Sequence, residues 1–222
     1  MQTFQTTTAT ATAVVHLPAG RLTVVAADRQ DTTVDVRPAN PAKRRDVEAA
    51  ERTTVDFADG VVRVTTPAEH RALGSTGFVD VTVQVPSGSR LQAEVASAEV
   101  RVVGRLGDVV VENAHGDIKV DEAATARLTT QAGDITVGRL TDSSTLRTAK
   151  GDLRVDEATA GTLELDTQLG GITVGVAAGV TASLDSGTAL GRVRNALAST
   201  GGAVTLQIRA TTAMGDISAH SL

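Results

Sequence analysis

Apolar and polar residues alternate over short stretches of this chain, the pattern of β-strands with one buried face. The clearest stretch runs from Val79 to Val85, where Val alternates with Asp, Thr and Gln. Gly or Pro turns separate many of the stretches, which predicts an all-β chain of short strands. In the first part of the chain the strands are expected at residues 14–17, 22–25, 33–36, 53–57, 61–64 and 79–85.

One stretch has the composition of a helix instead. Residues 43–52 are mostly good helix formers, and Val47 is the only β-branched residue among them. Asn40 is expected to cap this helix, with Pro41 in its first turn. Further along, Ala58-Asp59-Gly60 predicts a hairpin turn, and the Gly- and Ser-containing stretch from Pro67 to Gly77 predicts a loop.

From about residue 91 the chain becomes periodic, with a phrase of the form Leu-x-x-x-x-Gly-Asp-Ile/Leu-x-Val. The phrase is complete at residues 128–137 and 146–155, degenerates at Gly170-Gly171 and Gly191-Arg192, and returns at Gly215-Asp216-Ile217. Each period holds one short strand before the glycine and one after it. Because apolar residues fall two apart in both strands, each period contributes to two packed sheets.

The simplest structure with this property is a β-solenoid in which each period forms one coil. Equivalent residues of neighbouring coils would then stack about 4.8 Å apart. An antiparallel meander or sandwich, with the Gly-Asp pairs in hairpin loops, is the alternative. We expect residues 1–90 to form an N-terminal β region with one short helix that caps the same fold, and residues 91–222 to form the repeat region.

Composition narrows the chemistry. The three Phe residues are Phe4, Phe57 and Phe78, so Val, Ile, Leu and Ala must fill the core of the repeat region. The formal net charge of −5 and the lack of aromatic platforms argue against nucleic-acid binding. The absence of Cys excludes disulfides and thiol catalysis. No apolar stretch is long enough for a membrane span, and the N-terminus lacks the features of a secretory signal, which predicts a cytoplasmic protein.

The Gly-Asp turns have two interpretations. In the first, the acids form a ladder of carboxylates that binds calcium or acts as acid and base on a polysaccharide. In the second, each pair is a structural corner, in which the glycine adopts a positive φ and the acid accepts hydrogen bonds from neighbouring amides. Carboxylates 4.8 Å apart repel by about 0.9 kcal/mol even in water, and Gly171 and Arg192 interrupt the ladder. We therefore predict structural corners, and no catalytic, cofactor-binding or metal-ligating residues and no cofactor. The acids concerned are Asp108, Asp117, Asp134, Asp152 and Asp216.

The order of these phrases resembles a bacterial family of β-strand-repeat proteins of unknown function that are labelled putative adhesins. The resemblance rests on Leu-Thr-Val-Val-Ala-Ala-Asp-Arg at 22–29, Val-Asp-Val-Arg-Pro at 34–38, Val-Asp-Val-Thr-Val-Gln-Val-Pro-Ser-Gly-Ser-Arg at 79–90, the Gly-Asp-Ile turns and the final stretch from Ile208 to Ile217. It spans nearly the whole chain. It implies a repetitive β-fold with no known catalytic residues.

The function predicted from these features is a non-enzymatic, adhesin-like scaffold or binding module. Its partner would be a protein or a glycan, met by the Pro67 to Gly77 loop or by a flat sheet face. Exposed strands near Ile217 at the end of the solenoid would allow self-association. The alternative is a carbohydrate-active enzyme on a β-helix that uses the Gly-Asp carboxylates. Candidate residues for the binding face are Thr136, Arg147, Arg154 and Thr173.

Overall fold

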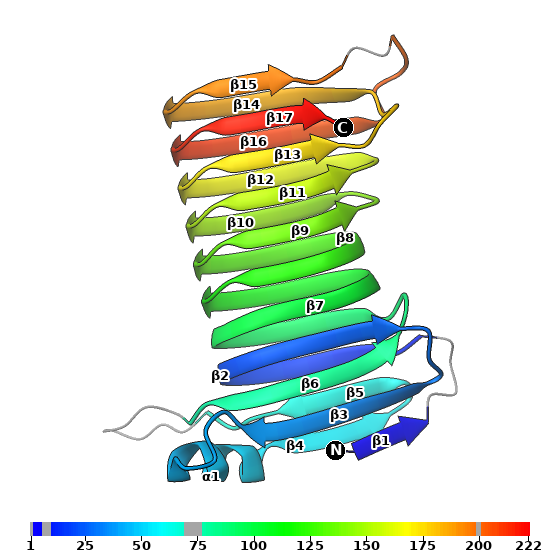
Figure 1. The fold of residues 1–222 in the computed structure, drawn as a ribbon, viewed down its shortest axis with the longest axis vertical. Helices are drawn as coiled ribbons and strands as arrows, with labels where there is room; N and C mark the ends of the chain where they lie inside the picture. Colours follow the sequence, from blue (N-terminus) through cyan, green and yellow to red (C-terminus); the bar gives the residue numbers. More distant parts are fainter. Residues whose placement is uncertain (1, 6–9, 69–76, 199–200) are drawn as a thin grey trace. The chain divides into compact units, whose positions relative to one another are not determined.

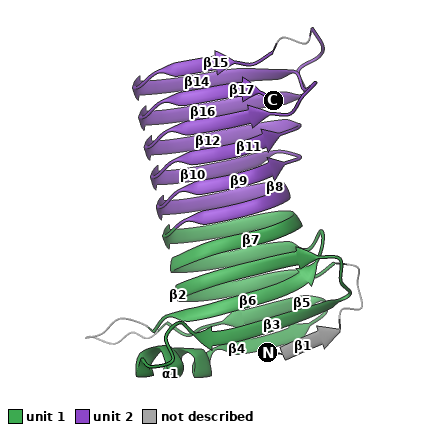
Figure 2. Ribbon diagram, viewed as in Figure 1, with its two compact units in different colours: residues 1–116 green, residues 117–222 purple. Residues whose placement is uncertain are grey.

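The computed structural model describes residues 2–5, 10–68, 77–198 and 201–222 (Figure 1). Strands dominate these residues, and α1 (Arg44–Arg52) is the one helix among them. The chain divides into two compact units, Met1–Gly116 and Asp117–Leu222 (Figure 2). The two complete Gly-Asp phrases, at residues 128–137 and 146–155, lie in the second unit.

The strands of unit 2 form two parallel stacks. The first stack contains β8, β10, β12, β16 and β14, and the second contains β9, β11, β13, β17 and β15, with the first residues of β8 paired to β9. Their bounds are β8 Ile118–Ala132, β9 Ile135–Leu140, β10 Ser144–Lys150, β11 Leu153–Ala158, β12 Gly161–Leu169, β13 Ile172–Val176, β14 Ala182–Leu190, β15 Val193–Ala196, β16 Leu206–Met214 and β17 Ile217–Ser221.

Equivalent residues of the repeat stack in register. Leu146 pairs with both Leu128 and Leu165, and Leu153 pairs with both Ile135 and Ile172. This parallel register confirms the β-solenoid with two strands in each coil. The antiparallel meander is wrong for unit 2, since every strand pairing described within this unit is parallel.

The interior of unit 2 consists of aliphatic columns. Each column takes one side chain from each coil, so small branched residues suit the short spacing between coils. The members are at most 2% exposed; they are Leu128, Leu146, Leu165 and Ala210 in one column, Ile118, Ile135, Leu153, Ile172 and Ile217 in another, and Val120, Val137, Val155, Val174 and Ala219 in a third.

The last coil in the chain is not the last coil of the stack. Strand β16 lies between β12 and β14, and β17 lies between β13 and β15 (Figure 1). The chain therefore skips one position after β13, builds the coil of β14 and β15, and then returns to fill the gap. As a result Ile217 is 1% exposed and the strand that contains it is no open end.

Unit 1 is built from longer strands that bend from one sheet into the next. Residues 12–16 of β2 pair with β5 and residues 20–27 pair with β6, while β7 runs parallel along the other side of β2. Pro18-Ala19-Gly20, which separates the strands expected at 14–17 and 22–25, is therefore a bend inside β2. The bounds in this unit are β1 Gln2–Gln5, β2 Thr12–Ala27, β3 Asp31–Pro38, β4 Thr54–Ala58, β5 Val61–Thr65, β6 Val79–Pro86 and β7 Arg90–His115.

Antiparallel strands and the helix cover the outer coil of unit 1. Strand β3 pairs antiparallel with β6, β4 with β5, and β1 with β3, while α1 contacts β3 and β6. The predicted hairpin turn is confirmed, with φ values of 52° at Asp59 and 75° at Gly60. The division of the fold at residues 90 and 91 stays a prediction.

The predicted helix cap at Asn40 is wrong. Lys43 occupies the N-cap position, and no side chain caps the helix there. The Asn40 side chain instead accepts a hydrogen bond from the Ala42 amide at 2.9 Å, and the Asn40 carbonyl accepts one from the Lys43 amide at 3.0 Å. These bonds form a turn ahead of the helix, because Asn favours a local side-chain turn as readily as a cap.

Candidate functional site

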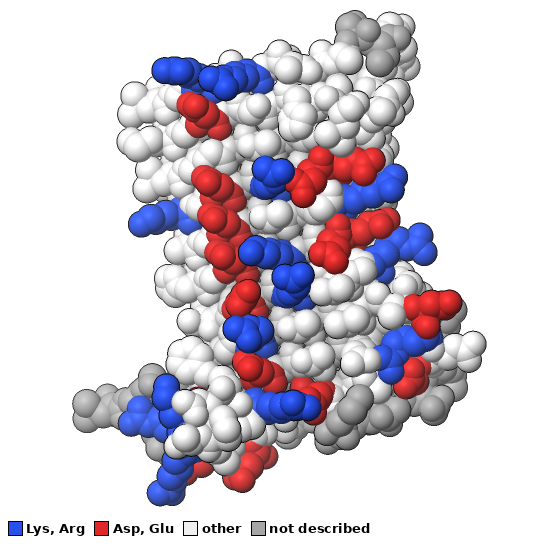
Figure 3. Space-filling model, in the orientation of Figure 1, with Lys and Arg blue, Asp and Glu red and all other residues white. Residues whose placement is uncertain are grey.

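The Gly-Asp corners connect neighbouring coils of unit 2, except at Gly171, where the acid is missing. One carboxylate oxygen of each acid accepts a hydrogen bond from the backbone amide at the equivalent position of the neighbouring coil. The bonds run from the Asp134 amide to Asp117 (3.0 Å), from Asp152 to Asp134 (2.8 Å), from Gly171 to Asp152 (2.7 Å) and from Arg192 to Asp216 (2.9 Å). Figure 3 shows acidic side chains following one another across successive coils of this unit.

This arrangement confirms the corner interpretation for Asp117, Asp134, Asp152 and Asp216. Each carboxylate points along the stack toward an amide, whereas acid and base catalysis on a glycan needs two carboxylates that face one substrate. Asp108 lies in unit 1 and forms an ion pair with Arg90 at 3.0 Å. Within the described parts of the chain, no group of three or more His, Asp or Glu side chains has the geometry to hold a metal ion.

A column of threonines accompanies the corners and was missed in the sequence; Thr148, Thr167 and Thr212 are buried, and Thr188 in the outermost coil is partly buried. Each threonine lies three residues before the turn glycine and donates its hydroxyl to the glycine carbonyl of a neighbouring coil. The bonds run from Thr148 to Gly133 (3.2 Å), Thr167 to Gly151 (3.1 Å), Thr212 to Gly170 (3.0 Å) and Thr188 to Gly215 (3.0 Å). The repeat is therefore better written Leu-x-Thr-x-x-Gly-Asp.

The corner at Gly171 lacks the carboxylate, and restoring it is expected to stabilise the protein. A Cβ at Gly171 meets only ordinary contacts, 3.4 Å from the Asp216 carbonyl oxygen and 3.8 Å from an Asp152 carboxylate oxygen. In Gly171→Asp, the new carboxylate is positioned to accept from the Asp216 amide as its neighbours do for theirs. We expect a gain of about 1 kcal/mol in the free energy of unfolding.

Chemical denaturation of this variant measures the gain. Gly171→Ala is the control, because it restricts the unfolded chain without adding an acceptor and should gain about half as much. Equal stability of the two variants would show that the carboxylate adds nothing at this corner.

The outer face of the second stack carries a polar groove of about 500 Å³. Arg139, Arg154, Thr173 and His220 line it from four successive coils, together with residues Gly138, Val155, Asp156, Glu157 and Leu222. Gly138 lies so close to the next coil that a Cβ would be 2.5 Å from the Asp121 carbonyl oxygen. Only glycine fits at this position because the two coils are so close. Since glycine has no side chain, the outer face of the stack is hollow at Gly138.

Exposed ion pairs border this groove. Arg154 contacts Asp156 at 2.6 Å, and Arg139 contacts Glu157 at 3.7 Å. The two arginine side chains are 60% and 48% exposed, respectively. Such pairs are worth about 0–1 kcal/mol each, so a partner carboxylate can replace them at little cost.

The structure brings together three of the four residues predicted for a binding face. Thr136, Arg154 and Thr173 stand side by side in the register of β9, β11 and β13. Arg147 lies on β10 in the other stack, where its guanidinium is 3.7 Å from Glu164, which also contacts Arg209 at 3.6 Å. Arg147 therefore belongs to a different face from the other three residues.

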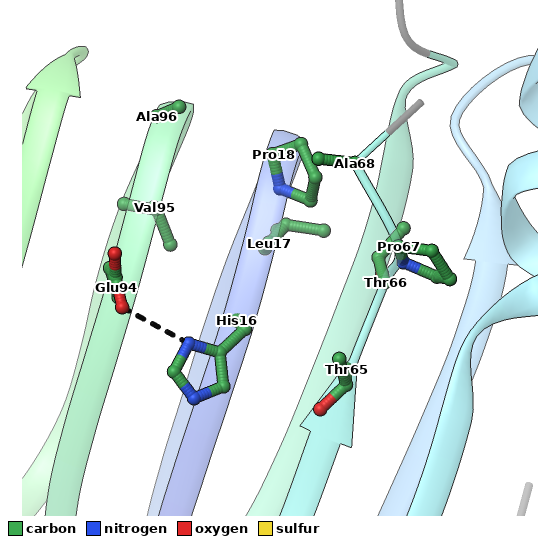
Figure 4. A pocket seen from close by; sticks show the side chains of 10 residues that line it. All are labelled: His16, Leu17, Pro18, Thr65, Thr66, Pro67, Ala68, Glu94, Val95 and Ala96. Atoms are coloured by element: carbon green, nitrogen blue, oxygen red, sulfur yellow. Dashed lines mark ion pairs between the residues drawn. The ribbon is translucent and has the colours of Figure 1, made fainter. Parts of the chain in front are cut away.

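Unit 1 contains a second hollow, a mainly apolar cleft of about 360 Å³ (Figure 4). Leu17, Pro18, Val95 and Ala96 line it beside the bend of β2, and Thr65 to Ala68 form its other side. At its rim His16 and Glu94 lie 3.3 Å apart. The predicted loop leaves from this rim, but its residues 69–76, His70 included, lie outside the described residues.

Three of the matching solved structures align with nearly the whole of this chain. A putative adhesin from Bacteroides fragilis aligns over 98% of this chain and 95% of its own, with 11% identity and a TM-score of 0.41. A putative cell adhesion protein from Clostridium sporogenes aligns over 100% and 98%, with 7% identity and a TM-score of 0.37. A putative adhesin from Parabacteroides distasonis aligns over 98% and 96%, with 11% identity and a TM-score of 0.37.

Comparison with curated proteins finds no match. Among the described residues, no helix combines the length and the apolar composition needed to cross a membrane. A family model, in contrast, matches residues 14–221, which include the Gly-Asp corners and both stacks of unit 2. The resemblance to a strand-repeat family is thus confirmed over nearly the full chain. The protein belongs to the Toastrack DUF4097 family, a family of domains of unknown function.

Proposed function

We propose that the protein is a non-enzymatic binding scaffold that offers the groove of unit 2 to a partner. The observation that carries the proposal is the position of Arg139 and Arg154 on neighbouring strands of one face, beside Thr173 and His220. Arginine contributes strongly to recognition because its planar guanidinium binds carboxylates through two hydrogen bonds. Parallel strands in register hold these side chains on a rigid base, which lowers the entropy lost on binding.

The composition of the face favours a protein segment with acidic or hydroxyl side chains over a glycan. Trp and Tyr are absent from the chain, and unit 2 contains no Phe, so the imidazole of His220 is the one aromatic ring among the described residues that line the groove. Acidic groups of a partner would displace Asp156 from Arg154 and Glu157 from Arg139, and would bind the two arginines in their place. A neutral glycan would have to be held mainly by hydrogen bonds, because it has no group that pairs with the arginines.

A peptide-display library and a glycan array, both probed with the purified protein, test the proposal. We expect peptides with acidic residues to be enriched, and their binding to weaken about tenfold or more in the double variant Arg139→Gln/Arg154→Gln. Binding should weaken with salt, because the groove uses exposed charges.

Arg147→Gln/Arg209→Gln is the matched control. It also removes two arginines that contact an acid, but from the outer face of the first stack. Binding that falls equally in both variants would place the site elsewhere or show nonspecific charge attraction. Array glycans that are bound and then cleaved would support the carbohydrate-active enzyme instead.

A further inference from the structure

The coil of β14 and β15 forms an open end of the stack in unit 2. Among the described residues, β14 pairs with β16 alone and β15 pairs with β17 alone, so one edge of each strand has no neighbour. An inward-pointing side chain of this coil is uncovered, since Val193 is 45% exposed. Ile217, which occupies the position of Val193 in the adjacent coil, is 1% exposed.

The outermost coil of unit 1 is protected differently. Strands β3 and β4 pair with it in the antiparallel direction, and α1 packs beside β3 and β6. Repeat proteins need such covers because each repeat buries its apolar face on a neighbour. The coil of β14 and β15 has no such cover from the described part of the chain, which makes it the surface most in need of a partner.

The corner of this coil offers no carboxylate to a further parallel coil. At each acidic corner the Asp side chain accepts the amide of the neighbouring coil, but Arg192 stands at that position here. A parallel strand added beyond β14 would find a cation in place of the acceptor. An antiparallel strand does not need an acceptor at this corner. Its own turn would lie at the opposite end of the two paired strands, away from Arg192.

Strand β14 is self-complementary in the antiparallel direction. In a pairing centred on Ser186, Ala182 lies opposite Leu190 of the second strand, Leu184 opposite Thr188, and Ser186 opposite its own copy. Large residues thus meet small or medium ones, and the two serine hydroxyls are placed to bond across the axis. We propose that a second copy of this chain docks on this end, with the two β14 strands antiparallel about a two-fold axis through Ser186.

The charges of the coil fit this register. Asp185 is the one charged residue of β14, and it falls opposite Gly187 of the second copy, so the two acids do not face each other. Arg192 and Arg194 follow the carboxyl end of the strand, and the antiparallel arrangement separates the arginines of the two copies to opposite ends. Two-fold pairing of one surface with itself is also the commonest symmetry of soluble oligomers.

Sedimentation equilibrium of the full chain over a range of concentrations tests the proposal. We expect a concentration-dependent species of twice the 22.7 kDa monomer mass. Gly187 is the site for the informative changes, because a Cβ there meets nothing within 4 Å and the fold of the monomer should tolerate it. Gly187→Asp sets like charges against Asp185 at two symmetric places and should weaken the dimer about tenfold, whereas Gly187→Lys should tighten it.

A compensating variant tests the register itself. Asp185→Lys/Gly187→Asp restores an attractive pair across the axis, so it should recover the dimer that Gly187→Asp loses. Failure of this rescue, with Gly187→Lys also without effect, would overturn the proposed pairing. A wild-type protein that stays monomeric at the highest concentrations would overturn the second copy as the partner.

Position Leu190 has a matched control in Leu169. Both residues pair with Met214 in the register, from opposite sides of it, and Leu169 is 46% exposed. Leu190→Asp should weaken the dimer strongly, while Leu169→Asp, which lies two coils inside the end, should leave it unchanged. Equal effects of both changes would show that the copies associate through the side of the stack.

Discussion

A chain truncated after Thr205 is expected to lose the folded structure of the coil of β14 and β15 in addition to the coil that is removed. The missing coil, β16 and β17, lies between its neighbours, so its loss breaks two coil interfaces rather than one. It also removes Leu206, Ile208 and Ile217, each at most 1% exposed. Burial of these side chains alone is worth about 5 kcal/mol or more, which is comparable with the stability of a whole domain.

Native-state hydrogen exchange measures this effect residue by residue. In the truncated chain we expect amides of β14 and β15 to lose protection, while those of β8 to β11 keep it. A truncated chain that stays protected up to β15 would mean that the coil of β14 and β15 can pair directly with β12 and β13.

An internal deletion of residues 178–203 is the matched control. It removes the coil of β14 and β15, which has a neighbour on one side only, and joins β13 to β16 through Ala177, Val204 and Thr205. The link between β11 and β12 is similarly short. This deletion breaks one interface and should cost much less stability than the truncation, even though it removes more residues.

The order of the coils is the part of the fold that the sequence did not reveal. Spacing of the Gly-Asp turns predicts how each coil folds, because the turn and the alternation of apolar residues are local properties. Every coil has nearly the same pattern of apolar residues facing its neighbours. The pattern therefore does not predict which coils lie next to each other in the stack. The long period between Gly191 and Gly215 is the one trace of the rearrangement.

Side-chain chemistry was predictable only where it repeats with the chain. The corner role of Asp134 and Asp152 followed from their fixed place after glycine and from the interruptions of the series. The hydroxyl bonds of Thr148 and its equivalents were not predictable, since a threonine in a strand gives no sign that its hydroxyl turns inward. His16 and Glu94 meet only through the pairing of β2 with β7, which no local pattern predicts.

Replacement of Gly151 by Ala is expected to destabilise the protein by about 3 kcal/mol or more. Gly151 has a φ of +149°, a region that residues with a Cβ rarely adopt, and a Cβ would lie 2.1 Å from the Gly133 carbonyl oxygen. Two costs therefore add: the strain of the backbone and a forced separation of the two coils. The separation would also lengthen the hydrogen bond from the Asp152 amide to Asp134, now 2.8 Å.

Thermal and chemical denaturation measure the loss, and Gly187→Ala is the control. Gly187 lies in a strand of the same unit, but its backbone is outside the positive φ region and nothing lies within 4 Å of the added carbon. We therefore expect Gly187→Ala to change stability by no more than about 0.5 kcal/mol. A small loss in Gly151→Ala, similar to that of the control, would show that neighbouring coils can move apart freely. The corners would then be replaceable turns, and the aliphatic columns alone would hold the coils in register.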